Sequence, residues 1–169
     1  HAGVAGTGTY PPIMSYRIAI NGFGRIGRTV LRAWAQRASS EDIAIVAINE
    51  IADAETVVHL ARYDSTHGRF PGRLDLEQSR LRVNDHRLRL LQQTDIASLP
   101  WGEQEVDLVL ECTGAFSDRW TAEQHLQAGG RRVLLSQPAQ PDVDSTIVWG
   151  LNQSVLTAQH RVVSAASCT

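Results

Sequence analysis

Three glycines near the start of the chain have the spacing of a phosphate-binding turn. Gly22, Gly24 and Gly27 follow the pattern G-x-G-x-x-G within the stretch NGFGRIGR. In such a turn the first glycine permits a tight bend, the second lets the backbone approach a pyrophosphate, and the third lets helix and strand pack closely. The following helix offers free N–H groups and the positive end of its dipole to the phosphates. The pattern alone is a weak signal, because glycine turns are common.

A carboxylate follows at the distance that a dinucleotide-binding turn requires. Glu50 lies 23 residues after Gly27, at the end of the next apolar run, where an acid accepts hydrogen bonds from ribose hydroxyls. Alone, such a carboxylate is more often a solvated strand end. Together with the glycine turn it favours ribose binding, and its negative charge disfavours the extra phosphate of NADP. The predicted cofactor is therefore NAD.

Polar and small residues also follow two later apolar runs. Thr113 and Gly114 come after one of them, and Ser136 ends the next. Open α/β sheets bind ligands at the carboxyl ends of their strands, so these residues are candidate cofactor contacts. On spacing alone, an ordinary turn residue is an equally good interpretation of each.

Cys168 is the candidate nucleophile, in a run of small residues that follows a predicted strand. A reactive thiol needs a lowered pKa, from a helix N-terminus or a basic neighbour, whereas a buried structural thiol is the commoner role of cysteine. None of the six histidines lies in a motif that marks a base. The sequence pattern leaves both roles of Cys168 open. Cys112, at the end of a buried strand, is interpreted as structural.

The elements around these residues alternate between strand and helix. Apolar runs predict strands over 16–20, 43–48, 106–110 and 132–136, and shorter strands over 146–149 and 161–164. Helical spacing predicts helices over 25–37, 53–62 with Asp53 as its cap, and 121–128. Alternation predicts a hairpin of 80–84 with 87–91, and 63–73 is expected to be a loop. The alternation indicates one doubly wound, mostly parallel Rossmann-type α/β sheet with helices on both faces.

Composition excludes several classes of function. The chain has 169 residues and a net charge of −2, so it carries no basic field for nucleic acid. All 16 basic residues are arginine, which excludes any mechanism that needs a lysine amine. No apolar run is long enough to span a bilayer, no metal-binding pattern stands out, and two cysteines favour a reducing, cytoplasmic setting. Residues 1–13 are expected to be a mobile leader or expression remnant outside a domain of 14–169.

Four motifs in order resemble the glyceraldehyde-3-phosphate dehydrogenase superfamily. They are NGFGRIGR (21–28), YDSTHGRF (63–70), ECTG (111–114) and SCT (167–169). The resemblance covers the chain from Met14 to Thr169, and as a set the motifs are highly specific. Within that superfamily the stretches AINEIAD (47–53), DVDST (142–146) and QHRVVS (159–164) are most similar to the erythrose-4-phosphate dehydrogenase branch.

The resemblance implies a chemistry. Cys168 would attack the aldehyde of a sugar phosphate, hydride would pass to NAD, and the resulting thioester would be released by water. The product from erythrose 4-phosphate would be 4-phosphoerythronate, on the route to pyridoxal phosphate; in the glycolytic branch inorganic phosphate releases the thioester. The implied substrate contacts are Ser167, Cys168 and Thr169. The implied cofactor contacts are Gly22, Phe23, Gly24, Arg25, Ile26, Gly27, Glu50, Thr113, Gly114 and Ser136.

The chain departs from the family pattern at two positions. Ala165 stands where the family usually has asparagine, which affects how the cysteine loop is positioned, and Thr94 stands where many members carry an NAD-binding arginine. Family members also have a second domain after the cysteine, with the activating histidine, the phosphate-binding arginines and most of a homotetramer interface. This chain alone is therefore expected to bind NAD without turnover. The alternatives are a glyceraldehyde-3-phosphate dehydrogenase and a non-catalytic Rossmann module.

Overall fold

The first helix joins two buried parallel strands. A computed structural model describes residues 15–37 and 42–166. Strand β1 (Tyr16–Asn21) leads through helix α1 (Arg25–Ala35) to strand β2 (Ile43–Asn49). The two strands pair in parallel, and all but the first residue of β2 are buried, as expected of a central strand covered on both faces. The predicted βαβ context of the glycine turn is confirmed.

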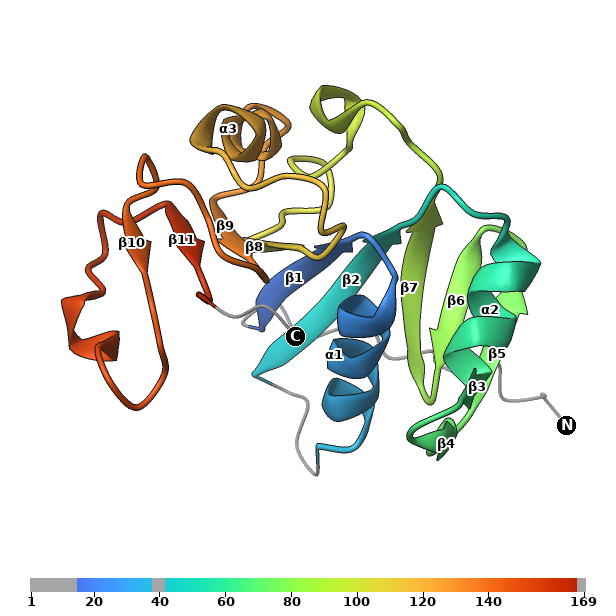
Figure 1. Cartoon of the computed structure of the whole chain (residues 1–169). Coiled ribbons are helices and arrows are strands. Elements are labelled where there is room, and N and C mark those ends of the chain that lie inside the picture. Colours follow the sequence, from blue (N-terminus) through green and yellow to red (C-terminus); the bar gives the residue numbers. More distant parts are fainter. Residues whose placement is uncertain (1–14, 38–41, 167–169) are drawn as a thin grey trace, which may run out of the picture.

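Among the described residues, nine strands form one sheet in the order β10-β11-β9-β8-β1-β2-β7-β6-β5 (Figure 1), and two further strands pair separately. The strands from β10 to β7 in that order pair in parallel, and β7, β6 and β5 pair antiparallel as a meander at one edge. Their bounds are β5 (Leu74–Glu77), β6 (Arg80–Val83), β7 (His86–Leu91), β8 (Leu108–Glu111), β9 (Arg132–Leu135), β10 (Ser145–Thr146) and β11 (Val162–Ser164).

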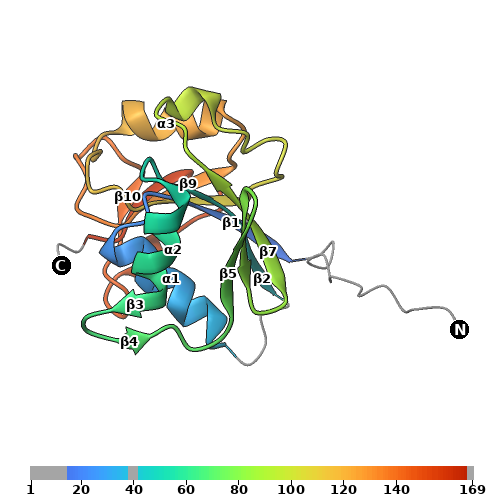
Figure 2. The same ribbon diagram turned by 90° about the vertical axis from the view of Figure 1, so that its right-hand side faces the viewer.

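Helices cover both faces of the sheet, which confirms the predicted doubly wound α/β class. α1 and α2 (Ala54–Arg62) lie on one face, and α3 (Arg119–Gln127) lies on the other with the short 3₁₀ helix η1 (Ile96–Ser98) (Figures 1 and 2). Each face has its own apolar core. Leu31, Ile48 and Leu88 belong to the core under α1 and α2, whereas Trp101 and Val109 belong to the core under α3.

Local capping determines where two helices begin. Asp53 caps α2 as predicted, because its carboxylate accepts a hydrogen bond of 2.9 Å from the N–H of Thr56. The predicted helix over 121–128 begins earlier, at Arg119, because the Asp118 carboxylate accepts a hydrogen bond of 2.8 Å from Thr121. The predicted helix over 25–37 ends at Ala35, and 36 is its C-cap.

Several predicted strand and loop boundaries were wrong. The expected loop over 63–73 contains a small hairpin of β3 (Tyr63–Asp64) and β4 (Gly68–Arg69), and β5 was not predicted. In the hairpin the Asp64 carboxylate accepts hydrogen bonds from the N–H groups of Thr66 and His67 in the tight turn. Such a turn produces no hydrophobic pattern in the sequence. The expected strand over 146–149 is only β10, because the Asn152 side chain donates to the carbonyl oxygen of Thr146 and accepts from the N–H of Val148, in place of a neighbouring strand. The strand predicted from 106 begins at 108.

No helix among the described residues is long and apolar enough to cross a membrane.

Candidate functional site

A cavity of about 410 Å³ lies at the carboxyl ends of β1, β2 and β8. From β1 the chain continues through α1 to β2, which pairs with one side of β1, whereas β8 pairs with the other side. The chain connections on the two sides of β1 therefore lead in opposite directions along the sheet. Open α/β sheets bind ligands at such a point. The cavity is lined by Gly22, Gly24, Glu50 and Thr113, predicted cofactor contacts from three separate segments. The fold therefore brings these segments together.

Each glycine of the turn meets different surroundings. Gly22 has φ of +89°, and a Cβ atom there would lie 2.6 Å from the backbone nitrogen of Thr113. A Cβ on Gly27 would lie 2.4 Å from the carbonyl oxygen of Gly22, so the third glycine allows the helix to pack on the turn. A Cβ on Gly24 would meet nothing within 4 Å. The open space beside Gly24 is what a backbone approached by a pyrophosphate requires.

The N-terminus of α1 faces this space. Gly24 is the N-cap of the helix and supplies no side-chain hydrogen bond, so the first-turn N–H groups remain available to phosphate oxygens. Arg25 is exposed and Ile26 is half-buried against the core. The side chain of Phe23 is buried in that core, so only its backbone lies at the turn.

Glu50 connects the end of β2 to the glycine turn. Its Oε2 atom accepts a hydrogen bond of 2.8 Å from the N–H of Phe23, and its Oε1 atom accepts one of 3.2 Å from Ala52. The carboxylate therefore lies directly beside the turn and lines the cavity. An acid in this place can accept hydrogen bonds from the ribose hydroxyls of a bound dinucleotide.

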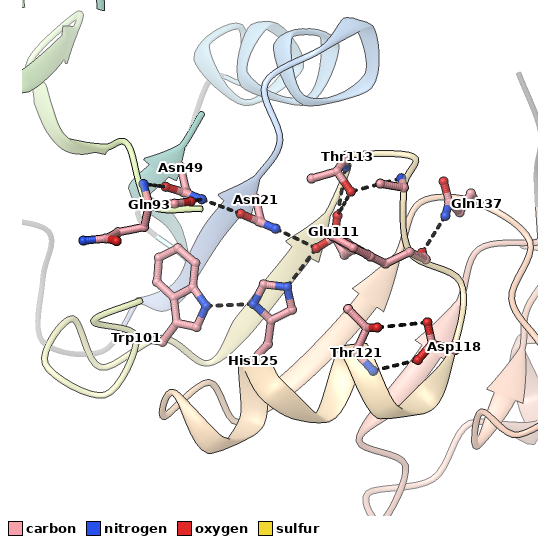
Figure 3. A network of polar contacts seen from close by, with 12 residues as sticks. Asn21, Asn49, Gln93, Trp101, Glu111, Thr113, Asp118, Thr121, His125 and Gln137 are labelled. Atoms are coloured by element: carbon pink, nitrogen blue, oxygen red, sulfur yellow. Dashed lines mark hydrogen bonds and ion pairs between the residues drawn. The ribbon is translucent and has the colours of Figure 1, made fainter. Parts of the chain in front are cut away.

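Thr113 is held by a buried carboxylate that the sequence analysis did not single out. Glu111, the last residue of β8, is 1% exposed and accepts hydrogen bonds from both the N–H and the hydroxyl of Thr113 (Figure 3). Burial alone would raise the pKa of Glu111, but hydrogen bonds from His125, Thr113 and Asn21 outweigh it and lower the pKa below its usual value. Glu111 is therefore an ionised group at the base of the Thr113 loop.

Six of the ten predicted cofactor contacts are not part of the cavity lining: Phe23, Arg25, Ile26, Gly27, Gly114 and Ser136. Gly114 has φ of +73° and continues the loop toward Gln137. Ser136 follows β9, and its N–H donates to the carbonyl oxygen of Glu111. The side chain of Ser136 also forms a hydrogen bond with Cys112. Burial raises the pKa of the Cys112 thiol to about 11, so Cys112 is the structural thiol that the sequence predicted.

Other residues complete the cavity. The apolar side chains of Ile51, Ile96 and Phe116 provide walls suited to a flat heterocycle, and Thr94 lines the cavity as well. The amide side chains of Asn21 and Asn49 lie at the strand ends beneath it. The sequence could have indicated Asn21, Asn49 and Glu111 as site residues, because each is a polar residue at the end of an apolar strand.

A larger cavity of about 620 Å³ lies elsewhere, beside the start of β1 and the β6–β7 hairpin. Arg17, Arg80 and Arg89 line it, and it touches neither the glycine turn nor Glu50. Of these two cavities, only the smaller one combines the glycine turn, the helix N-terminus and the acid, so it is the candidate dinucleotide site.

The predicted substrate contacts Ser167, Cys168 and Thr169 lie outside the described residues. Strand β11 is parallel to β9 and ends at Ser164, at the same edge of the sheet as the cavity. Ala166, the last described residue, has φ of +62°. A non-glycine residue in the left-handed region is uncommon and is found more often beside functional sites.

The parallel sheet, the glycine turn at its switch point and the acid at the end of β2 define a Rossmann-type dinucleotide-binding domain. The family model described as "Glyceraldehyde 3-phosphate dehydrogenase, NAD binding domain" matches residues 16–119. The chain belongs to this family, and its cofactor is NAD.

Two curated relatives from Cupriavidus necator match nearly the whole chain. They are the chromosomal glyceraldehyde-3-phosphate dehydrogenase, 50% identical over 156 residues, and the plasmid glyceraldehyde-3-phosphate dehydrogenase, 49% identical over 156 residues. Each match covers 92% of this chain and 46% of the relative. The chain therefore spans about half the length of these relatives.

Proposed function

We propose that this chain is the NAD-binding half of a dehydrogenase that oxidises the aldehyde of a sugar phosphate. The observation that carries the proposal is the convergence of Gly24, the N-terminus of α1 and Glu50 on one cavity. Gly24 and the helix would hold the pyrophosphate, and Glu50 the adenosine ribose. The apolar wall of Ile51 and Phe116 would hold the adenine.

The proposed reaction uses Cys168 as the nucleophile. Its thiolate would attack the aldehyde carbon to give a thiohemiacetal, with the carbonyl oxygen taking up a proton. NAD, when bound, would supply the acceptor for the hydride that leaves this carbon, and the hydroxyl proton would be lost to solvent as the thioester carbonyl forms. The resulting thioester would then be cleaved by water, which regenerates the thiol and releases a carboxylate. Covalent capture divides one difficult oxidation into two easier steps.

The leading substrate is erythrose 4-phosphate, and glyceraldehyde 3-phosphate is the second candidate. The stretches 47–53, 142–146 and 159–164 favour the first, and the second is the substrate in the names of the two relatives. We propose that the whole protein is a cytoplasmic homotetramer.

Nucleotide titration tests the binding half of the proposal. We expect NAD to bind the chain, NADP to bind at least about tenfold more weakly, and Glu50→Ala to lose that preference. Glu55→Ala, on the exposed face of α2, is the matched control and should keep it. Calorimetry measures all six affinities. Equal binding of NAD and NADP, or no binding of either, would contradict the assignment of Glu50.

Turnover is tested on the whole protein. NADH formation with each sugar phosphate, with and without inorganic phosphate, separates the two candidates. Hydrolytic release predicts a rate with erythrose 4-phosphate that does not need phosphate. A rate seen only with glyceraldehyde 3-phosphate and inorganic phosphate would instead support the glycolytic reaction. Cys168→Ser should abolish either rate.

A further inference from the structure

Glu111 is the centre of a buried hydrogen-bond network beneath the nucleotide cavity (Figure 3). Its Oε2 atom lies 2.7 Å from Asn21 Nδ2 and 2.8 Å from His125 Nε2, and its Oε1 atom accepts from Thr113. His125 and Trp101 are fully buried. A carboxylate removed from water is tolerated only where donors replace its hydration, and here side chains from β1 and α3 do so.

The contact with Trp101 shows which nitrogen of His125 carries the proton. The indole N–H can only donate, and Trp101 Nε1 lies 3.0 Å from His125 Nδ1. His125 Nδ1 therefore accepts and has no hydrogen. The hydrogen of the neutral imidazole is then on Nε2, where it points at Glu111. The contact between His125 and Glu111 is therefore a neutral imidazole N–H donating to a carboxylate.

The network reaches the residues that line the cavity. The Cys112 N–H donates to the Asn21 carbonyl oxygen at 2.7 Å, and Thr113 lies in contact with Gly22. Asn49 Nδ2 donates to Asn21 Oδ1 at 2.8 Å, which extends the network to the end of β2. Because these contacts share Glu111 and Asn21, a shift of Glu111 would displace the Thr113 loop and the glycine turn together.

We propose that His125 and Trp101 are positioning residues for the nucleotide: they hold the Glu111 carboxylate in the one orientation that places Thr113 and Asn21 at the rim of the cavity. This inference rests on the proposed function of the cavity. It assigns a binding role to two residues that touch no ligand, in addition to their contribution to the core.

Two substitutions of His125 separate its two hydrogen bonds. A glutamine amide N–H reaches the region of Nε2, so His125→Gln keeps a donor for Glu111. An asparagine oxygen reaches the region of Nδ1, so His125→Asn keeps the acceptor for Trp101 and leaves Glu111 without its donor. We expect His125→Asn to raise the Kd for NAD about tenfold and His125→Gln less than about threefold, measured by calorimetry.

Trp101→Phe tests the hydrogen bond to His125 and serves as a second variant should His125→Asn fail to fold. Without the indole donor, Nδ1 loses its hydrogen bond and the ring is held by Glu111 alone, so the imidazole no longer fixes the orientation of the carboxylate. The ¹⁵N chemical shifts of the His125 ring report this change without any nucleotide. We expect the Nδ1 shift to move as its hydrogen bond is lost, the hydrogen to stay on Nε2, and the Kd for NAD to rise about threefold to tenfold. Trp120→Phe, an exposed position 73% accessible on α3, is the matched control and should change neither.

Hydrogen exchange of the nucleotide-free chain distinguishes positioning from simple stability. Positioning predicts faster amide exchange at 112–115 in His125→Asn and Trp101→Phe, with little change in β9 and β11. A uniform increase over the sheet together with an unchanged Kd for NAD would overturn the proposal. If the unsubstituted chain binds no NAD, the proposed function fails. The Nδ1 shift and the exchange at 112–115 then still decide whether His125 and Trp101 position the loop.

Discussion

Gly22 and Gly24 lie two residues apart in one turn, yet a methyl group would have opposite consequences at each. Gly22→Ala combines a left-handed φ with a contact of 2.6 Å to a backbone nitrogen, so we expect a loss of about 2–3 kcal/mol in the free energy of unfolding. Chemical denaturation measures it. A loss below about 0.5 kcal/mol would contradict the packing of the turn on the Thr113 loop.

Gly24→Ala should leave stability nearly unchanged, because φ is −74° and the new Cβ meets open space. The same methyl would stand where a pyrophosphate approaches, so we expect the Kd for NAD to rise at least about tenfold. Calorimetry beside a denaturation curve gives both quantities. A variant that is stable and binds NAD normally would show that the phosphates lie elsewhere.

The two thiols should differ strongly in reactivity. Cys112 is buried, and burial raises its pKa to about 11, so near neutral pH it is almost entirely the unreactive thiol. We expect iodoacetamide to label the native chain at Cys168, and mass spectrometry identifies the labelled site. Cys112→Ser should leave labelling unchanged and Cys168→Ser should remove it. Rapid labelling of Cys112 in the native protein would contradict its burial.

At the scale of elements, Asp144 joins α3 to the end strands of the sheet. Its carboxylate accepts from the Arg119 guanidinium at 2.7 Å and from the N–H groups of Arg161 and Val162. Burial opposes ionisation, but these donors outweigh it and lower the pKa of Asp144 to about 2. The interaction therefore stabilises the fold above the unfolded pKa of about 4 and is lost as the pH falls through about 2.

We expect Asp144→Asn to lower the free energy of unfolding by about 1–2 kcal/mol near pH 7, with the difference shrinking below about pH 4. Denaturation at several pH values measures it. Asp85→Asn, in the exposed turn between β6 and β7, is the control. A loss of equal size at every pH would mean that the Asp144 charge does not stabilise the folded state.

At the scale of the whole molecule, the cavity couples nucleotide binding to folding. It draws its lining from β1, β2, the segment after β7 and the loop after β8, so unfolding of any of these destroys it. Saturation at about one hundred times Kd adds about 2.7 kcal/mol, which raises the melting temperature of a chain of this size by about 5–10 °C. Thermal scans with NAD and NADP measure this. We expect a smaller shift with NADP; equal shifts would contradict the predicted preference.

The features that depend only on residues close together in the chain, such as strands, helices and helix caps, could be predicted from the sequence. Periodic apolar runs predicted β1, α1, β2 and the β6–β7 hairpin, because burial on one or both faces leaves a direct pattern. The N-cap of α2 could be predicted from Asp53, because a capping hydrogen bond joins a side chain to a backbone N–H only three residues further along the chain. The short β3–β4 hairpin was not predictable in this way, because a hydrogen-bonded turn around Asp64 has no hydrophobic period.

The sequence by itself determined the family resemblance, NAD as the cofactor and the order of the strands along the chain. Only the tertiary structure decided which strands are neighbours, and therefore that Glu50, Thr113 and the glycine turn share one cavity. It also decided the role of His125. That residue lies 14 positions from Glu111 and 24 from Trp101, so no spacing rule joins them. Parallel pairing and the packing of α3 bring them together, and burial makes their hydrogen bonds obligatory.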